Sequence, residues 1–348
     1  MKSKVNVALV GLRFGAAFIP IYLHHPNVAS LTLCDTDEEV LSEWGDKYQV
    51  ERRVRSLEDI LESENVDAVH LVTPVNIHAE QSVAVLEAGK HCACTIPMGL
   101  TIDELTAVIA AQRQAKKNYM MMETAVYTRE FLFVKVLMES GELGPITFVR
   151  GAHLQDMEGW PSYWTGFPPL VHITHAFAPA LALLRTRAIK VHCFGSGQLR
   201  GDLRGQYGNR FPFETAIFRL ENTNVSAEVS RFMFQTARSY TESFAIYGEK
   251  KSFEWQQLED EDPVVFSMHP LSEKRGSPIA AERVRAPDRS DLLPKEIARF
   301  TQRGVYDEST PHLSFLQGGG HGGSHPHLAH EFVSSIVEER ASWIDEGT

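Results

Sequence analysis

The first sixteen residues constrain the fold most, because they join a buried strand to a glycine turn and a helix. Residues 5–10 read Val-Asn-Val-Ala-Leu-Val, a nearly continuous apolar run. Runs of this kind are typical of strands that are buried on both faces of a parallel sheet. Glycines follow at positions 11 and 15, and then a helical stretch that reaches about residue 24. This order predicts the first unit of a doubly wound α/β fold.

Short apolar runs alternate with helical patterns over the next hundred residues. The runs lie at 31–34, 66–72, 91–95 and 119–122. Between the last two, Thr101-Ile102-Asp103-Glu104 has capping-box spacing and predicts the start of a helix. Strands that alternate with helices at this spacing indicate a parallel sheet. We therefore predict an N-terminal Rossmann domain over residues 1–124.

The pattern changes after residue 144 to longer strands that follow one another closely. We expect strands at 146–156, 188–197, 213–220, 224–233 and 242–249, and a helix near 171–185. Such strands favour a mostly antiparallel sheet in an α+β domain over residues 125–348. We expect an irregular stretch at 267–314, a glycine-rich loop at 318–323 and a final helix near 328–340. That helix can pack back on the Rossmann domain.

Composition limits the classes of partner and the compartment. The net charge is -11, and the acidic residues are dispersed. Nucleic acids and anionic membrane surfaces attract clustered Lys and Arg, so neither is an expected partner. Four cysteines are too few for a disulfide scaffold, which favours a cytoplasmic protein. No stretch approaches the roughly 18 apolar residues that a membrane helix needs.

The turn after the first strand predicts a dinucleotide site. It keeps the first glycine and the last small residue of the G-x-G-x-x-G/A fingerprint, but Arg13 replaces the middle glycine and could face the phosphates. Asp35 ends the second strand, where a carboxylate accepts hydrogen bonds from ribose hydroxyls and repels a 2′-phosphate. NAD is therefore predicted over NADP. The alternative is a plain turn with Asp35 as a helix cap. The turn consists of Gly11, Leu12, Arg13, Phe14, Gly15 and Ala16.

A second motif carries a family resemblance. The segment Thr73-Pro74-Val75-Asn76-Ile77-His78, together with residues 88–91 and 141–144, resembles the glucose–fructose oxidoreductase / inositol dehydrogenase / MocA (Gfo/Idh/MocA) family. The resemblance spans nearly the whole chain. It implies a Rossmann domain followed by a domain with a large, open and mainly antiparallel sheet, which binds substrate and forms homodimers or homotetramers. It also implies cofactor contacts from Thr73, Pro74, Asn76, His78, Thr95, Ile96, Pro97 and Glu123.

The chain departs from that family at its Glu-Lys-Pro motif, which here reads Thr95-Ile96-Pro97. The family's lysine lies near the nicotinamide and assists proton transfer, whereas the Ile96 side chain has no proton to exchange. The family's Asp-x-x-x-His pair implies His175 for the histidine, and Val171 then replaces the aspartate. The resemblance thus implies a branch without two of the family's usual groups.

Histidine is the remaining residue type for acid–base chemistry. Oxidation of a secondary alcohol needs hydride transfer and removal of the hydroxyl proton, and a base of near-neutral pKa assists the second step. His172 and His175 are three residues apart and would share a helix face. We predict that His175 is the acid–base group and that His172 orients the substrate or relays the proton. The alternative is that either one merely packs.

Further polar and aromatic residues are candidates for substrate contact. Large aromatics beside polar groups suit the mixed faces of a carbohydrate, although such a stretch can also simply cover a domain junction. The histidines between 321 and 330 do not have the spacing of a standard zinc site, so no metal is expected. The candidates for substrate contact are Tyr127, Arg150, His153, Asp156, Trp160, Tyr163, Trp164, His321 and His325.

These observations together predict an NAD-dependent oxidoreductase. Its expected substrate is a secondary hydroxyl of a sugar, a glycoside (carbon 3 is a candidate position) or a cyclitol. One alternative is a glycoside-cleaving enzyme or lyase that recycles NAD internally. Another is a non-catalytic relative that only binds the cofactor.

Overall fold

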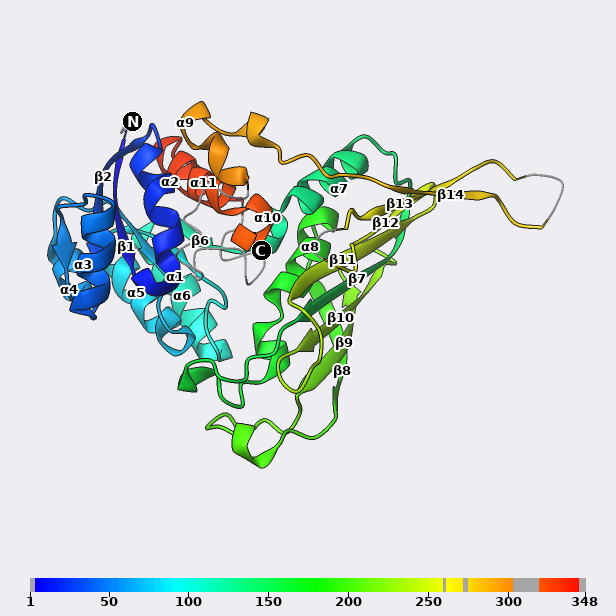
Figure 1. Ribbon diagram of the computed structural model, residues 1–348, viewed down its shortest axis with the longest axis horizontal. Helices are drawn as coiled ribbons and strands as arrows, with labels where there is room; N and C mark the ends of the chain where they lie inside the picture. The colour runs from blue at the N-terminus through cyan, green and yellow to red at the C-terminus, as the bar shows by residue number, and fades with distance from the viewer. Residues whose placement is uncertain (1–3, 259–260, 272–274, 303–318, 344–348) are drawn as a thin grey trace. The chain divides into compact units, whose positions relative to one another are not determined.

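The computed structural model describes residues 4–258, 261–271, 275–302 and 319–343 (Figure 1). The chain forms two compact units, one of residues 1–127 with 289–348 and one of residues 128–288. The division expected from the sequence placed the boundary after residue 124, with the final helix able to pack back on the Rossmann domain. In the structure the chain returns to the first unit at residue 289.

Unit 1 contains a six-stranded parallel sheet with the strand order β3-β2-β1-β4-β5-β6. This is the Rossmann order, so the predicted fold class is confirmed for this half. The continuous apolar run of β1 has the expected cause, since Val7, Ala8 and Leu9 are fully buried. The strands are β1 (Val5–Val10), β2 (Val28–Cys34), β3 (Arg53–Val54), β4 (Ala68–Leu71), β5 (His91–Cys94) and β6 (Tyr119–Met121).

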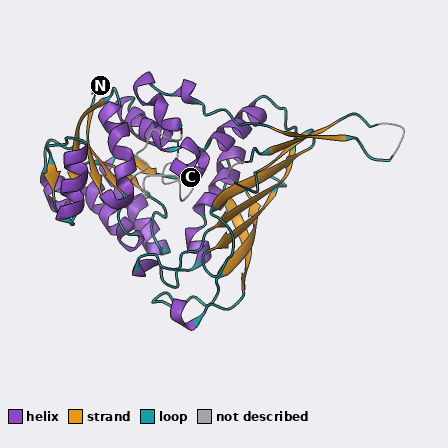
Figure 2. Ribbon diagram, in the orientation of Figure 1, coloured by secondary structure: helices purple, strands orange, loops and turns teal. Residues whose placement is uncertain are grey.

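Helices connect these strands (Figure 2). The predicted capping box is present at α6, where Thr101 and Glu104 satisfy each other's backbone N–H groups. The glycine-rich stretch at 318–323 was expected to be a loop, but residues 319–323 form a short helix that continues towards α11. The helices are α1 (Leu12–Gly15), α2 (Ile19–His24), α3 (Glu38–Lys47), α4 (Leu57–Glu62), α5 (His78–Glu87), α6 (Ile102–Ala115), α9 (Lys295–Ala298), α10 (Gly319–Gly323) and α11 (His325–Val337).

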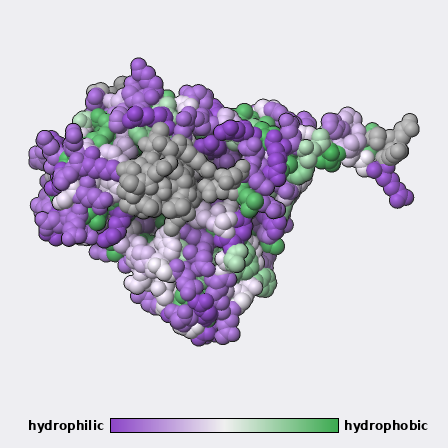
Figure 3. Space-filling model, viewed as in Figure 1, coloured by the Kyte–Doolittle hydropathy of each residue, from purple (hydrophilic) through white to green (hydrophobic). Residues whose placement is uncertain are grey.

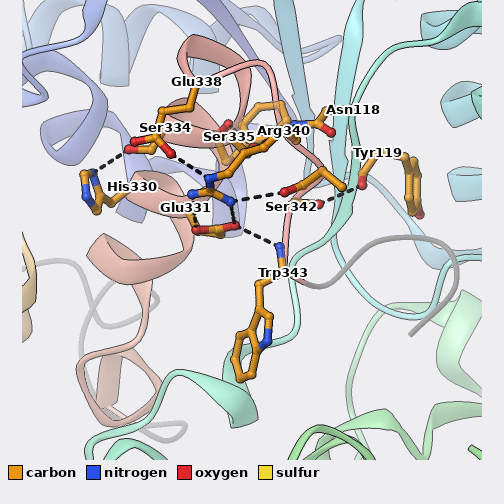
Figure 4. Close-up of polar contacts among 12 residues, drawn as sticks. Asn118, Tyr119, His330, Glu331, Ser334, Ser335, Glu338, Arg340, Ser342 and Trp343 are labelled. Carbon is orange, nitrogen blue, oxygen red and sulfur yellow. Dashed lines mark hydrogen bonds and ion pairs between the residues drawn. The ribbon is translucent and has the colours of Figure 1, made fainter. Parts of the chain in front are cut away.

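The last described residues bind the edge strand β6 (Figure 4). Asn118 donates to the carbonyl oxygen of Arg340 at 3.0 Å, and the Ser342 hydroxyl donates to the carbonyl oxygen of Tyr119 at 3.0 Å. The Arg340 guanidinium makes two hydrogen bonds to the Glu331 carboxylate, at 2.6 and 2.9 Å. Such paired, charge-assisted bonds fix orientation as well as distance. The bonds of Asn118 and Tyr119 hold the C-terminal segment to the sheet of unit 1.

Unit 2 contains an eight-stranded sheet with the order β14-β13-β12-β11-β7-β10-β9-β8. All neighbours are antiparallel except β7 and β10. The predicted open, mostly antiparallel sheet is thus confirmed. Its strands are β7 (Ile146–Leu154), β8 (Ala188–Ser196), β9 (Phe213–Leu220), β10 (Ser226–Phe232), β11 (Thr241–Gly248), β12 (Lys251–Glu254), β13 (Val264–Met268) and β14 (Ile279–Arg283).

In the described part of unit 2, helices α7 (Arg129–Glu139) and α8 (Thr174–Leu184) lie on one face of the sheet, and the opposite face carries none (Figure 1). Three sequence-based expectations need correction. Strand β14 lies within the stretch that was expected to be irregular, because it pairs with β13 along five residues. Helix α7 was not foreseen. His172 ends a 3-10 turn before α8 instead of lying on that helix.

None of the helices in the described part of the chain combines the length and the apolar character that a bilayer crossing requires.

Candidate functional site

The turn after β1 lies against the end of β4, where the strand order of unit 1 reverses. Gly11 has a φ of +87°, and a Cβ atom there would lie 2.3 Å from the carbonyl oxygen of Val72. Only glycine satisfies both conditions. At Gly15 a Cβ would lie 3.2 Å from the Val72 side chain, so this glycine permits close packing. Ligands of doubly wound folds bind at this switch point, and the turn fits a dinucleotide phosphate there.

Asp35 holds the turn in place from the end of β2. One carboxylate oxygen accepts from the backbone N–H of Leu12 at 2.8 Å, and the other accepts from the N–H of Asp37 at 2.9 Å. The cap of α3 is Asp37, whose side chain accepts from that helix's first turn. Asp35 therefore fixes two loops at the edge where a ribose binds in Rossmann folds.

Two arginines approach the same edge. Arg13, which replaces the fingerprint's middle glycine, forms an exposed ion pair with Asp37 at 2.8 Å. Arg55 donates to the carbonyl oxygen of Thr36 at 3.2 Å and pairs with Glu38 at 3.1 Å. Sequence reasoning placed Arg13 in the dinucleotide turn but did not foresee Arg55 at this edge. The fold brings both arginines there.

His78, at the start of α5, is a buried cation. Its Nδ1 lies 2.8 Å from the carbonyl oxygen of Pro97, and its Nε2 lies 2.8 Å from that of Thr73. Both nitrogens face acceptors, so both carry protons. Burial lowers the pKa of His78, but its interactions with Cys94 and with the two carbonyl groups raise this pKa to about 9. His78 thereby ties together the ends of β4 and β5, including the position of the missing lysine.

The remaining predicted cofactor residues divide between surface and core. Asn76 and Pro74 are exposed, whereas Ile96 and Glu123 are buried. The Glu123 carboxylate accepts from the N–H of Ala125 at 2.9 Å. Phe14 packs edge-on against the rings of His321 and His325, at 5.7 and 6.0 Å.

His321 thus lies beside the dinucleotide turn, as does part of the C-terminal segment. His325 is buried, stacks on Phe18 at 4.6 Å, and lies 3.1 Å from His321 between ring nitrogens. Burial and the neighbouring histidines lower the pKa of His325. Tyr127 is buried against His327 and Trp343 in the same unit. The burial of His325 and Tyr127 is therefore explained by packing within unit 1.

A row of ionisable side chains crosses the sheet of unit 2. His153 on β7 pairs in register with Arg231 on β10 and with Glu242 on β11. Arg231 in turn pairs with Glu214 on β9. Facing residues on neighbouring strands point the same way, with Cβ atoms about 5 Å apart. His153, Arg231 and Glu242 are all buried beneath α8, at 1%, 0% and 8% exposure.

Helix α8 adds His175 to this row. Its Nε2 lies 3.3 Å from a carboxylate oxygen of Glu242, and the two side chains are 8% and 6% exposed. The His175 ring also lies 5.0 Å from that of His153 and 5.5 Å from that of His172. Gly151 makes this approach possible, because a Cβ there would lie 1.8 Å from the carbonyl oxygen of Ala176.

The row also holds a buried positive charge. Burial lowers the pKa of Arg231 to about 9, although the nearby Tyr240 and Glu242 act in the opposite direction. Its guanidinium donates to the side-chain oxygen of Gln155 at 3.2 Å. Glu214 accepts from the N–H of Leu170 at 2.8 Å and so anchors the turn that bears His172. Burial raises the pKa of Glu214.

Only part of the predicted substrate set gathers around these histidines. Trp164 contacts His172 with ring centroids 5.2 Å apart, and Trp160 and Tyr163 pack on Trp164. Arg150 lies on the opposite face of the sheet, where it pairs with Glu228 at 3.2 Å. The reason is the alternation of side chains along β7, which places Arg150 and His153 on different faces.

Asp156 is exposed, and its carboxylate accepts from the N–H of Glu158 at 3.0 Å in the turn that follows β7. Sequence reasoning missed Arg231, Glu242, Tyr240 and Glu214. A signal was available for two of them. Arg231 and Glu242 occupy inward positions of alternating strands that are otherwise apolar.

Residues 5–123 match the family model of the Gfo/Idh/MocA proteins, described as an oxidoreductase family with an NAD-binding Rossmann fold. Unit 1 carries the nucleotide-binding domain of the Gfo/Idh/MocA family. The resemblance expected from the Thr-Pro-x-Asn-x-His segment is therefore confirmed. The match includes the turn at Gly11, Asp35, His78 and Ile96.

Curated relatives of the chain include a glycosyl hydrolase family 109 protein from Shewanella baltica. It is 27% identical over 197 residues, which make up 50% of this chain and 43% of the relative. A second protein of that name, from Phocaeicola vulgatus, is 27% identical over 203 residues, or 52% of this chain and 42% of the relative. The chain thus spans less than half the length of the curated relatives it matches.

Among solved structures, levoglucosan dehydrogenase in complex with NADH and levoglucosan superimposes with a TM-score of 0.72. It is 19% identical, and the match covers 99% of this chain and 93% of the other. At this level of identity the likeness shows that the two proteins share a fold over both units.

Proposed function

We propose that the protein is an NAD-dependent oxidoreductase that acts on a secondary hydroxyl of a sugar, a glycoside or a cyclitol. The family of unit 1 supports the cofactor class. Solved structures of the same fold include a levoglucosan dehydrogenase bound to NADH and a UDP-N-acetylglucosamine 3-dehydrogenase from Acidithiobacillus ferrooxidans, with TM-scores of 0.72 and 0.70. Their names favour a carbohydrate, and the second favours carbon 3.

The buried His175–Glu242 pair carries this proposal. Ile96 leaves the chain without the family's lysine, so the substrate's hydroxyl proton needs another acceptor. The 3.3 Å contact with Glu242 orients the His175 imidazole and stabilises its protonated form. A bound nicotinamide would supply the hydride acceptor. His172 and Trp164 would position the substrate beside His175.

NAD, and not NADP, is the proposed cofactor because of Asp35. Its carboxylate lies at the end of β2, where it would repel the 2′-phosphate of NADP. The positive charge of Arg55 reduces the preference for NAD over NADP. It does not abolish that preference, because Arg55 forms an ion pair with Glu38 at 3.1 Å. Thr73, Asn76 and Glu123 are proposed as further cofactor residues at the ends of the strands.

The test is reduced-cofactor formation with a panel of sugars, glycosides and cyclitols, for the native protein and His175→Asn. We expect His175→Asn to lower kcat by about 10²–10⁴-fold, the usual contribution of an acid–base group. Its affinity for NADH should not change, because His175 is in unit 2. Arg150→Ala on the other face of the sheet is the matched control and should keep kcat. Full activity in His175→Asn would exclude the assigned role.

A second candidate is a glycoside-cleaving enzyme that recycles its NAD. The names of the curated relatives favour it. Transient oxidation at one ring carbon makes the C–H of the adjacent carbon acidic, so a leaving group can be eliminated before the hydride returns. The two candidates differ in their products. This second function predicts release of an aglycone without net NADH, whereas the first predicts NADH in proportion to ketone.

A further inference from the structure

We propose that His153, His175 and Glu242 bind one divalent transition-metal ion. The three side chains come from β7, α8 and β11, and their ligand atoms all lie within 4.8 Å of one another. No metal is expected from the sequence, and the histidines weighed for one lie near the C-terminus. The spacing of those histidines does not match a zinc site. His153 and Glu242 are instead brought together by the register of β7 and β11, and His175 by the packing of α8.

The spacing of the ligand atoms fits an ion with little movement. Ligands at about 2.1 Å from a tetrahedral zinc ion lie about 3.4 Å apart. His175 Nε2 and the Glu242 oxygen are already 3.3 Å apart. The widest pair, at no more than 4.8 Å, needs to close by about 1.4 Å or less, which small side-chain rotations provide.

The donor set and its burial indicate the class of metal. Two imidazoles and one carboxylate form the three-ligand set of catalytic zinc sites, and they also suit Co²⁺, Mn²⁺ and Fe²⁺. Each ligand is less than 9% exposed, in contrast to acidic clusters on a protein surface. The Tyr240 hydroxyl donates to the Glu242 carboxylate and so supplies the outer support that metal-binding carboxylates usually have.

Three protein ligands leave the fourth position of a tetrahedral ion for water or substrate, and the local charge indicates which kind of ligand binds there. A divalent ion with Glu242 carries a net charge of +1, and the nearby Arg231 adds a further positive charge. Such a site favours an anionic oxygen ligand, and a bound metal lowers the pKa of a coordinated hydroxyl. It would therefore stabilise a substrate alkoxide, which the Ile96 side chain has no group to do.

This catalytic role rests on the proposed function, whereas metal binding does not. With the ion bound, His175 is a ligand and no longer the proton acceptor, so the substrate O–H bond breaks and its proton passes to solvent. The C–H bond then breaks with its electron pair going to NAD⁺, and the products are a ketone, NADH and a proton. The metal changes no oxidation state, so no further oxidant is needed.

Metal binding is tested on untagged protein that has been stripped with a chelator, using Zn²⁺ calorimetry and Co²⁺ absorption. We expect one ion per chain and visible cobalt bands characteristic of four or five ligands. His153→Ala and Glu242→Gln should each weaken binding by more than about 100-fold, since even changes outside the ligand set cost 10–100-fold. His172→Ala, a histidine of the same cluster outside the ligand set, is the matched control and should keep binding.

Two outcomes would overturn the site: no stoichiometric binding of either ion by folded protein, or binding that survives both His153→Ala and Glu242→Gln. The functional role has a separate readout. Chelator-stripped protein that oxidises its substrate at the full rate would exclude the metal from the reaction while leaving the oxidoreductase intact. Cobalt bands in a protein that never reduces NAD⁺ would support the site and reject the proposed function.

Discussion

At the scale of single residues, this protein places charged groups where its strands are otherwise apolar. Arg231 and Glu242 sit at inward positions on either side of His153, and each helps to offset the cost of burying the other. Burying an isolated charge costs free energy, and clusters of buried ionisable side chains are typical of functional sites. In unit 1, the Asp35 carboxylate accepts hydrogen bonds from two loops and holds both in place.

Asp35→Ala is expected to weaken NADH binding by about 10- to 100-fold. The substitution would remove the proposed charge-assisted hydrogen bond to the ribose and free the Leu12 N–H, and bonds of this type are worth about 1.5–3 kcal/mol. NADPH should lose less affinity, since the repelling carboxylate has gone and Arg55 remains. Fluorescence titration with both reduced cofactors measures the change.

Asp37→Asn is the control for this experiment, because it keeps the cap of α3 and removes only an exposed ion pair with Arg13. Its effect should stay within about fivefold. Equal losses for Asp35→Ala and Asp37→Asn would contradict the role of Asp35.

At the scale of elements, the approach of α8 to β7 decides whether the histidine cluster exists. The helix can reach the sheet only because residue 151 has no side chain. The 3-10 turn that precedes α8 is anchored by Glu214 and brings His172 to the same place. Helix packing and sheet register together, and not the spacing of histidines along one helix, form the cluster.

Gly151→Ala should destabilise the protein by about 1–3 kcal/mol, the usual cost of overpacking, by pushing α8 away from β7. It should also reduce turnover, because His175 moves away from Glu242. Urea unfolding measures the first effect. Gly201→Ala is the matched control, since a Cβ there meets nothing within 4 Å, and it should change stability by less than about 0.5 kcal/mol. Equal stability of the two variants would refute this account of the packing.

At the scale of the whole molecule, a mostly hydrophilic surface contrasts with one face that exposes apolar side chains. The face in Figure 3 is mostly hydrophilic, in keeping with the dispersed charge of the chain. The helix-free face of the unit 2 sheet differs. Phe194 and Ile217 on this face are 74% and 55% exposed, and Phe213 stacks on Phe232 there at 4.0 Å. We propose this face as the contact of a homodimer or homotetramer.

The double variant Phe194→Asp/Ile217→Asp should convert the oligomer to monomer in light scattering coupled to gel filtration. Charged groups at the centre of an apolar contact must lose their water on association, which disfavours the assembly. Ile102→Asp tests an equally exposed apolar residue of unit 1, at 80% exposure, and should leave the mass unchanged. A native protein that is already monomeric at high concentration would remove the basis for this proposal.

Stability should be greatest near pH 6.5, because two buried histidines of unit 1 have pKa values shifted in opposite directions. Burial lowers the pKa of His70 to about 3, and its interactions raise that of His78 to about 9. Below pH 6.5 the unfolded chain protonates at His70 and the folded one does not, so stability falls with falling pH. The stabilisation from His78 is complete below pH 6.5 and is lost as pH rises towards 9.

Each effect has a slope of about 1.4 kcal/mol per pH unit at most. Urea unfolding at acidic, near-neutral and alkaline pH measures the profile. His78→Gln should reduce the loss of unfolding free energy at alkaline pH, and His70→Phe should reduce the loss at acidic pH. A native profile that keeps rising above pH 7 would contradict the assignment of His78 as a buried cation.

The sequence by itself determined the Rossmann topology, the glycine at position 11, the carboxylate at position 35 and the family. These are local patterns, and the register of a buried parallel strand leaves little freedom. Only the tertiary structure decided the rest. It paired Arg231, His153 and Glu242 across three strands, placed Arg150 on the other face and brought Arg55 to the backbone of Thr36. Contacts between residues far apart in the chain depend on strand order and helix packing, which no local periodicity records.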